Sequence, residues 1–198
     1  MIAGISFVLA AYLCGSLTSA ILVSRILHLP DPREEGSRNP GASNMLRLHG
    51  KRAALLTLAG DVLKGMLPTL AARLAQQPES VIGLCALAAF LGHLYPLFFG
   101  LRGGKGVATL GGALVGMHWP LGLVYFGVWL VAAGLSRYAS LAAVAAAAAV
   151  LFASAALAAA RPFFGYNLPM CLLLFWRHRE NIRRLLAGRE ERIRLKKT

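Results

Sequence analysis

Acidic side chains are scarce in this 198-residue chain, which has 8 Asp and Glu residues against 21 Lys and Arg residues. The few carboxylates are not paired as a di-metal site requires, and no His/Cys cluster has the spacing of zinc ligands. No Gly-x-Ser-x-Gly segment precedes a predicted helix, which excludes the serine triad of α/β-hydrolases. We therefore expect chemistry that uses neither a metal ion nor another cofactor.

Cysteines are also rare, and the chain lacks the pattern of a disulfide framework or of a cleavable signal sequence. Cys14, Cys85 and Cys171 each lie in an apolar run without ligand-like spacing, so we interpret them as small buried side chains.

The segment from Met1 to Leu13 has no charged start and no convincing cleavage site, and apolar residues continue to Val23. We interpret it as part of a retained membrane span.

Apolar residues make up 57% of the chain, a proportion that is rare in a soluble domain. A transmembrane helix needs about 20 mainly apolar residues to cross a hydrocarbon core of roughly 30 Å. The segments that meet this requirement are 3–24, 53–73, 80–100, 110–133 and 138–160. A further apolar piece, 162–176, is too short to cross comfortably. The sequence predicts an all-α membrane protein with a single domain, 1–198: a polytopic helical bundle of five full spans plus short or re-entrant helices, up to seven helices.

The basic residues gather in two segments, with six of them in 25–52 and nine in 177–198. Nucleic-acid-binding proteins can have a similar excess of positive charge. Here the basic segments flank apolar spans, which favours membrane lipid and phosphate-bearing ligands as partners, and no nucleic acid. Because Lys and Arg are enriched in cytoplasmic loops, we expect 25–52, 101–109 and the basic tail 177–198 inside the cell and the N-terminus outside.

Asp31–Arg47 is a polar, basic and turn-rich segment between two apolar spans. Gly36, Pro40 and Gly41 allow tight turns that could aim its side chains inward. The polar side chains that it gathers are Arg33, Ser37, Arg38, Asn39, Asn44 and Arg47. This composition suggests a site for an anionic ligand at the membrane surface.

A second polar segment, Arg102–Thr109, has glycines on both sides of Lys105. Such glycines let backbone amides approach phosphate oxygens, and the lysine adds a full charge. The segment is not a nucleotide P-loop, because Phe99 and Gly106 occupy the positions where that motif needs Gly and Ser or Thr. The alternative is a glycine-rich turn with no ligand.

Two pairs of polar residues have helical i,i+3 spacing. Asp61 and Lys64 lie inside an apolar segment, where ionisable residues are costly and often functional. They could equally pair with each other and support a site structurally. His178 and Asn181 begin the basic tail, where a histidine among arginines is more often a solvated surface residue than a catalyst.

Four blocks together resemble, in order and over nearly the whole length, the bacterial acyl-phosphate:glycerol-3-phosphate acyltransferase family. They are Gly36-Ser37-x-Asn39-Pro40-Gly41-Ala42-x-Asn44 with Arg47, Gly92-His93-x-x-Pro96, Gly103-Gly104-Lys105-Gly106-Val107-Ala108-Thr109, and Arg177-His178-x-x-Asn181-Ile182-x-Arg184-Leu185. The resemblance implies a small multi-pass enzyme of the bacterial inner (cytoplasmic) membrane. Its active site would face the cytoplasm.

The resemblance further implies the reaction. A fatty acyl group would pass from acyl phosphate to the 1-hydroxyl of glycerol 3-phosphate, giving lysophosphatidate and inorganic phosphate in the first acylation of phospholipid synthesis. The His-x4-Asp motif of thioester-using acyltransferases is missing from the chain, in agreement with an acyl-phosphate donor. We expect direct transfer, and either His178 or a substrate phosphate oxygen could accept the proton.

Site residues can be carried over by position. The resemblance assigns catalytic roles to Ser37, Arg47, Lys105, His178 and Asn181. It assigns substrate or phosphate binding to Gly36, Asn39, Gly41, Asn44, Gly103, Gly104, Gly106 and Thr109. The alternative function is a small membrane transporter for a phosphorylated metabolite, which predicts internal repeats and polar groups near the middle of several spans. Only Asp61 and Lys64 fit the second requirement, and no repeat is visible.

Overall fold

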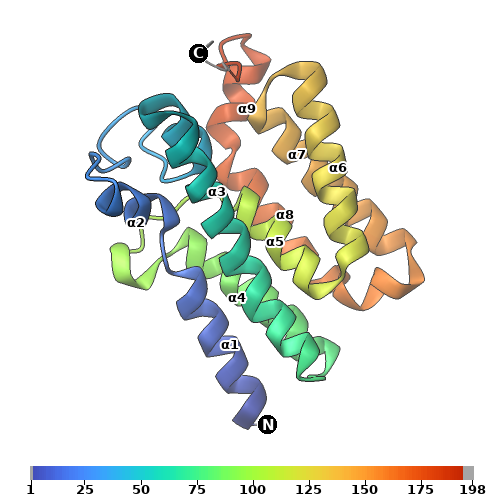
Figure 1. Cartoon of the computed structure of the whole chain (residues 1–198). Helices are drawn as coiled ribbons and strands as arrows, with labels where there is room; N and C mark the ends of the chain where they lie inside the picture. Colours follow the sequence, from blue (N-terminus) through green and yellow to red (C-terminus); the bar gives the residue numbers. More distant parts are fainter. Residues whose placement is uncertain (1, 194–198) are drawn as a thin grey trace. The chain divides into compact units, whose positions relative to one another are not determined.

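The computed structural model describes residues 2–193, and all of its regular elements are helical (Figure 1). The α-helices are α1 (Ile2–Gly15), α2 (Ser19–Ile26), α3 (Ala42–Leu74), α4 (Glu79–Leu94), α5 (Val107–Met117), α6 (Trp119–Ser136), α7 (Ala139–Ala156), α8 (Phe164–Arg177) and α9 (Arg179–Leu186). Short 3₁₀ helices occupy Leu97–Phe99 and Ala158–Phe163. The all-α prediction is confirmed. The chain divides into two compact units, of which the first ends at Gly122 and the second begins at Leu123.

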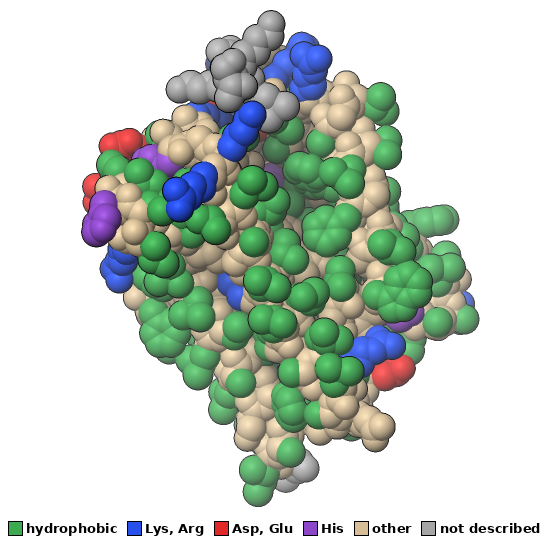
Figure 2. Space-filling view, in the orientation of Figure 1, with side chains coloured by type: hydrophobic (Ala, Val, Ile, Leu, Met, Phe, Trp, Pro, Cys, Tyr) green, Lys and Arg blue, Asp and Glu red, His purple; other side chains and the backbone are tan. Residues whose placement is uncertain are grey.

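Within residues 2–193, four helices are long and apolar enough to cross a membrane, or five if α1 and α2 form one bent span. The bend between α1 and α2 is 50°. Large hydrophobic side chains such as Leu63, Leu67 and Phe152 are exposed, and hydrophobic side chains cover much of the face in Figure 2. Exposed apolar surface of this extent is expected where helices contact lipid. The chain is thus a membrane protein, while the predicted count of five spans and the outside N-terminus stay predictions.

One predicted span differs in the structure, because 110–133 contains the end of α5 and most of α6. The two helices are separated at His118, whose backbone is extended (φ −157°, ψ 93°). Pro120 follows at the second position of α6, where a missing N–H costs nothing and the ring disfavours helix in the preceding chain. Hydropathy is high on both sides of this break, so an apolar window alone does not reveal it.

Close helix packing organises the first unit, in which α3 contacts α1, α2, α4 and α5 and α1 packs against α4. Glycines permit a close approach between α3 and α5. A Cβ atom on Gly112 would lie 2.0 Å from the carbonyl oxygen of Val62, and one on Gly65 would lie 2.2 Å from that of Thr109. Small residues allow this approach in membrane helices, where van der Waals packing drives association.

The second unit is built on α7, which packs against α8, α9 and the 3₁₀ helix Ala158–Phe163. The alanine-rich sequence of α7 is buried at Ala142, Ala143, Ala146 and Ala147, and Ala147 accepts a hydrogen bond from the Cys171 thiol at 3.5 Å. Small side chains thus let α7 and α8 approach closely, as the composition of this tract suggests.

A break inside α3 separates the predicted polar segment from the membrane-spanning part of the same helix. Gly50 has φ +82° and ψ −172°, a backbone conformation that glycine adopts far more readily than other residues. The short part before Gly50 carries Asn44 and Arg47, and the long part after it carries the apolar span. Val23 of α2 packs in one cluster with Met45 and Ala53, which lie on either side of this break.

Candidate active site

The loop between α2 and α3 is held in shape by the buried side chain of Asn44. Its amide nitrogen donates to the carbonyl oxygens of Pro32 at 2.9 Å and Glu35 at 3.2 Å. Its amide oxygen accepts the backbone N–H of Ser37 at 2.9 Å. Gly36 has φ +59°, and a Cβ atom on this residue would lie 2.5 Å from the amide oxygen of Asn44. Asn44 therefore organises the loop that presents the exposed Ser37.

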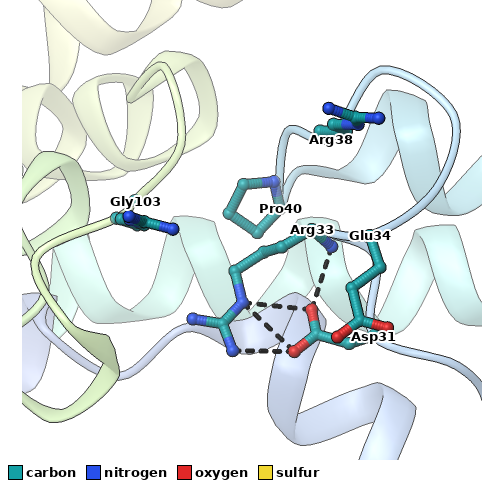
Figure 3. Close-up of a pocket in the computed structure, with 7 residues that line it drawn as sticks. Asp31, Arg33, Glu34, Arg38, Pro40 and Gly103 are labelled. Atoms are coloured by element: carbon teal, nitrogen blue, oxygen red, sulfur yellow. Dashed lines mark hydrogen bonds and ion pairs between the residues drawn. The ribbon is translucent and has the colours of Figure 1, made fainter.

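A second interaction joins this loop to the segment that follows α4. The Arg33 guanidinium forms an ion pair with Asp31 at 2.7 Å and donates to the carbonyl oxygen of Phe99 at 3.2 Å. Figure 3 shows the guanidinium lying against the carboxylate. The hydrogen bond from Arg33 holds the pKa of Asp31 below its ordinary value, and the same contact raises the pKa of Arg33. Both groups are charged at neutral pH. The bond between the two loops is therefore a charge-assisted hydrogen bond from Arg33 to the carbonyl oxygen of Phe99.

A cleft of about 450 Å³ opens where these two loops meet (Figure 3). Of the described residues, its lining consists of Asp31, Arg33, Glu34, Arg38, Pro40, Arg102 and Gly103. Three arginines against two acidic residues leave one excess positive charge. The two predicted polar segments therefore meet at one basic cleft in the first unit, which is lined by residues from within 31–40 and by 102–103. Ser37, Arg47 and Lys105 belong to the same segments but are not among its lining residues.

The glycine-rich segment packs against the end of α4. The N–H of Gly103 donates to the carbonyl oxygen of Leu94, and that of Gly104 to the carbonyl oxygen of His93, both at 3.2 Å. The sequence predicts that these amides approach phosphate, whereas in this structure both are hydrogen-bonded within the protein. Lys105 is partly exposed and comes two residues before Val107, the first residue of α5. A helix N-terminus favours a nearby anion, so Lys105 is well placed for one.

The remaining predicted residues of the first unit differ in exposure. Arg47 is exposed on the short first part of α3, and Asn39 is half-buried just before that helix. Gly41 is the N-cap residue just before α3, with extended backbone, and Gly106 precedes α5 with φ +84°. Thr109 is fully buried, and its carbonyl oxygen faces Gly65 of α3. In this structure Thr109 is therefore part of the packing between α5 and α3.

His178 and Asn181 belong to the second unit, at the junction of α8 and α9. His178 is 3% exposed, which contradicts the interpretation as a solvated surface histidine. Its Nδ1 lies 2.9 Å from the carbonyl oxygen of Leu174. A carbonyl oxygen only accepts, so Nδ1 carries the proton and Nε2 is the basic nitrogen of the neutral ring.

Asn181 is bound by Glu190, a residue that lies outside the four sequence blocks. The Glu190 carboxylate accepts hydrogen bonds from Asn181 at 2.6 Å, Ser140 at 2.7 Å and Arg184 at 2.7 Å. Burial raises the pKa of Glu190, but these three donors outweigh it and hold that pKa below its ordinary value. Glu190 thus ties α9 to the start of α7. Of the predicted basic tail 177–198, residues 194–198 lie outside the described part.

Within residues 2–193, no three His, Cys, Asp or Glu side chains come together in the way that would hold a metal ion.

Comparison with known proteins identifies the family. The family model for glycerol-3-phosphate acyltransferase matches residues 5–188. The glycerol-3-phosphate acyltransferase of Methylococcus capsulatus is 49% identical over 193 residues, which is 94% of each chain. That of Burkholderia ambifaria is 50% identical over 191 residues, covering 96% of this chain and 90% of the relative.

Two crystal structures have the same fold. PlsY (YgiH), an integral membrane glycerol 3-phosphate acyltransferase, in its glycerol 3-phosphate form has a TM-score of 0.91 and 37% identity, covering 97% of this chain and 96% of PlsY. Its lysophosphatidic acid form has a TM-score of 0.89 and 36% identity, covering 98% and 96%. These matches span nearly the full length and confirm the resemblance drawn from the four sequence blocks. The chain belongs to the glycerol-3-phosphate acyltransferase family.

Proposed function

We propose that this protein transfers a fatty acyl group from acyl phosphate to the 1-hydroxyl of glycerol 3-phosphate. The products are 1-acyl-glycerol 3-phosphate (lysophosphatidate) and inorganic phosphate. The basic cleft between the two polar loops is the structural observation that carries the proposal, because both substrates are phosphorylated. The related PlsY structures, in glycerol 3-phosphate and lysophosphatidic acid forms, support the same acceptor and product.

Acyl phosphate is proposed as the donor on chemical grounds. The chain has no His-x4-Asp motif, which thioester-using acyltransferases carry. An acyl phosphate is a mixed anhydride that is already activated, and phosphate is a good leaving group. Transfer can therefore be direct, with the 1-hydroxyl attacking the acyl carbon while the carbon–oxygen bond to phosphate breaks. No acyl-enzyme at Ser37 is required.

Positive charge and hydrogen-bond donors are the main contribution of the protein. Arg47 and Lys105 bind the phosphates and offset the negative charge that develops on the acyl oxygen. Ser37, Asn39 and Asn181 orient the glycerol and acyl-phosphate oxygens. Asn44 acts mainly by holding the loop that carries Ser37, since its amide is bonded to that loop.

The proton of the attacking hydroxyl has two possible acceptors. Nε2 of His178 is the basic nitrogen when Nδ1–H is bonded to Leu174, and a phosphate oxygen of the substrate is the alternative. A pH–rate profile of His178→Gln decides between them. If His178 is the base, the variant loses the fall in rate on the acid side. If a phosphate oxygen accepts the proton, the variant is slower but keeps the wild-type profile.

We place the protein in the bacterial inner (cytoplasmic) membrane as a multi-pass protein, with its site facing the cytoplasm. The basic segments 25–52 and 177–198 flank apolar helices, and cytoplasmic loops carry an excess of Lys and Arg. This orientation gives both water-soluble glycerol 3-phosphate and the lipid donor access to the same side of the membrane.

The function is tested with purified protein in detergent, given palmitoyl phosphate and glycerol 3-phosphate in the presence of EDTA. We expect phosphate release that depends on glycerol 3-phosphate and is matched by lysophosphatidate formation. Palmitoyl-CoA in place of palmitoyl phosphate should give no product. A folded sample without turnover would contradict the proposal and direct attention to the transporter alternative, tested by flux into liposomes.

A further inference from the structure

Three ionisable side chains are buried together in the first unit: Asp61 and Lys64 of α3 and His93 of α4. They are 2%, 5% and 4% exposed. One carboxylate oxygen, Oδ1 of Asp61, lies 2.8 Å from Nζ of Lys64 and 3.6 Å from Nδ1 of His93. Charged groups are costly within a membrane span, and two well-packed apolar side chains would hold the helices at least as well. The ionisable cluster therefore calls for a role beyond packing.

Lys64 connects this cluster to the bend between α1 and α2. Its ammonium group donates to the carbonyl oxygen of Leu17 at 2.8 Å. Leu17 lies between the end of α1 and the start of α2, where backbone carbonyls lose their helical partners. The Lys64 side of the cluster is thus structural: it satisfies the backbone at the bent span.

His93 connects the same carboxylate to the glycine-rich segment. A Cβ atom on Gly104 would lie 2.3 Å from Nε2 and 2.9 Å from Cε1 of the imidazole, so the ring lies directly against that residue. The backbones of the two residues are also bonded, since the N–H of Gly104 donates to the carbonyl oxygen of His93. Lys105 is the next residue along the chain. The imidazole therefore lies between the buried Asp61 and the segment that carries Lys105.

We propose that Asp61 and His93 are positioning residues for Lys105. Asp61 fixes the ring of His93, and the ring fixes the Gly103–Lys105 segment, so the ammonium group of Lys105 is held where a substrate phosphate binds. The proposal rests on the proposed function, in which Lys105 is a phosphate ligand. It also accounts for Gly104, because a larger residue there would displace the imidazole.

The experiment compares two double variants that both remove the buried charges. Asp61→Asn/Lys64→Gln keeps a polar oxygen facing the imidazole of His93, whereas Asp61→Leu/Lys64→Met removes it. Both should remain folded. The Leu/Met variant should have the lower thermal unfolding temperature in detergent, because methionine cannot replace the hydrogen bond from Lys64 to Leu17. We expect kcat/KM of the Leu/Met variant to fall roughly tenfold below that of the Asn/Gln variant, the loss typical of groups that orient a ligating residue. Equal values would overturn the proposal and leave a purely structural ion pair.

A coupling test shows whether the effect passes through Lys105. Lys105→Arg keeps the charge but changes the geometry of the donor. In that background the Asp61→Leu/Lys64→Met change should cost less than about threefold, because residues that act through one another are not additive. A full tenfold loss in both backgrounds would contradict the positioning role.

His93→Gln gives an independent measurement that leaves the Asp61–Lys64 ion pair in place. We expect it to unfold at the wild-type temperature and to lose roughly tenfold in kcat/KM. A wild-type kcat/KM would overturn the proposal. Wild-type protein assayed in parallel separates the two hypotheses: an inactive wild type contradicts the proposed function, whereas an active wild type with equally active variants contradicts only the positioning role.

Discussion

The side-chain oxygen of Asn44 accepts the backbone N–H of Ser37 at 2.9 Å, across seven residues of chain. The same amide donates to the carbonyl oxygens of Pro32 and Glu35, so one side chain fixes three points of the loop. A residue assigned by its sequence motif to substrate binding thus uses its hydrogen-bonding groups on its own loop. Its contribution to catalysis is then to hold Ser37 in place.

This relationship predicts the behaviour of Asn44→Ala. Three loop backbone groups lose their partner, at about 1 kcal/mol for each net hydrogen bond, and the loop gains freedom. We expect kcat/KM to fall at least tenfold, cleavage by protease within 31–41 to become faster, and the thermal unfolding temperature to fall by several degrees. Ser43→Ala, at an exposed position beside Asn44, is the matched control. Wild-type activity in Asn44→Ala would show that Ser37 needs no support.

Charge removal tests the proposed phosphate ligands. Lys105→Ala and Arg47→Ala each delete a cation whose role is to bind phosphate and offset charge in the transition state, so we expect turnover to fall by about 10²–10³-fold. Both variants should elute and unfold like the wild type. Arg52→Ala removes an exposed arginine beyond the Gly50 break and should keep near-normal activity. Near-normal activity in Lys105→Ala or Arg47→Ala would contradict the phosphate assignment.

Glu190 predicts a pH-dependent stability. Its pKa is lowered in the folded protein, so the stabilisation that it provides is complete above the ordinary carboxyl pKa, near 4.3, and is lost as pH falls through the lower folded value. Glu190→Gln offers one acceptor oxygen and an N–H₂ group to three donors, so we expect about 1–3 kcal/mol of destabilisation at neutral pH. The unfolding temperature of this variant should then depend less on pH than that of the wild type between pH 3 and 6.

Glu180→Gln is the control for that measurement. Glu180 pairs with Arg183 at 2.8 Å on an exposed face of α9, where an ion pair contributes little. It should therefore unfold at nearly the wild-type temperature throughout the same pH range. An equal loss in both variants would mean that the three hydrogen bonds of Glu190 do not stabilise the fold.

The sequence allowed most helices and both polar segments of the first unit to be predicted, because hydropathy and turn residues are local signals. The break at His118 was missed since apolar residues continue across it, although Pro120 was a usable sign. The role of Asn44 could not be read from its motif. An amide side chain can bind a ligand or a backbone equally well, and only the folded loop decides which.

Long-range contacts explain the other differences. Glu190 meets Ser140 across fifty residues of sequence, and no local pattern links them. The pairing of Asp61 with Lys64 follows from i,i+3 spacing, but the contact with His93 depends on how α4 packs against α3. Sequence motifs therefore located the chemistry, whereas the partners that orient it required the three-dimensional structure.

Helix packing between α3 and α5 gives a test that is independent of the active site. A Cβ atom at Gly112 would lie 2.0 Å from the carbonyl oxygen of Val62, so Gly112→Ala must push the two helices apart. Overpacking of this kind costs about 1–3 kcal/mol, which should lower the unfolding temperature in detergent by several degrees. In α6, a Cβ atom on Gly127 meets nothing within 4 Å, so Gly127→Ala should unfold at or slightly above the wild-type temperature, because alanine favours helix. If Gly112→Ala is as stable as Gly127→Ala, α3 and α5 are not in the close contact described here.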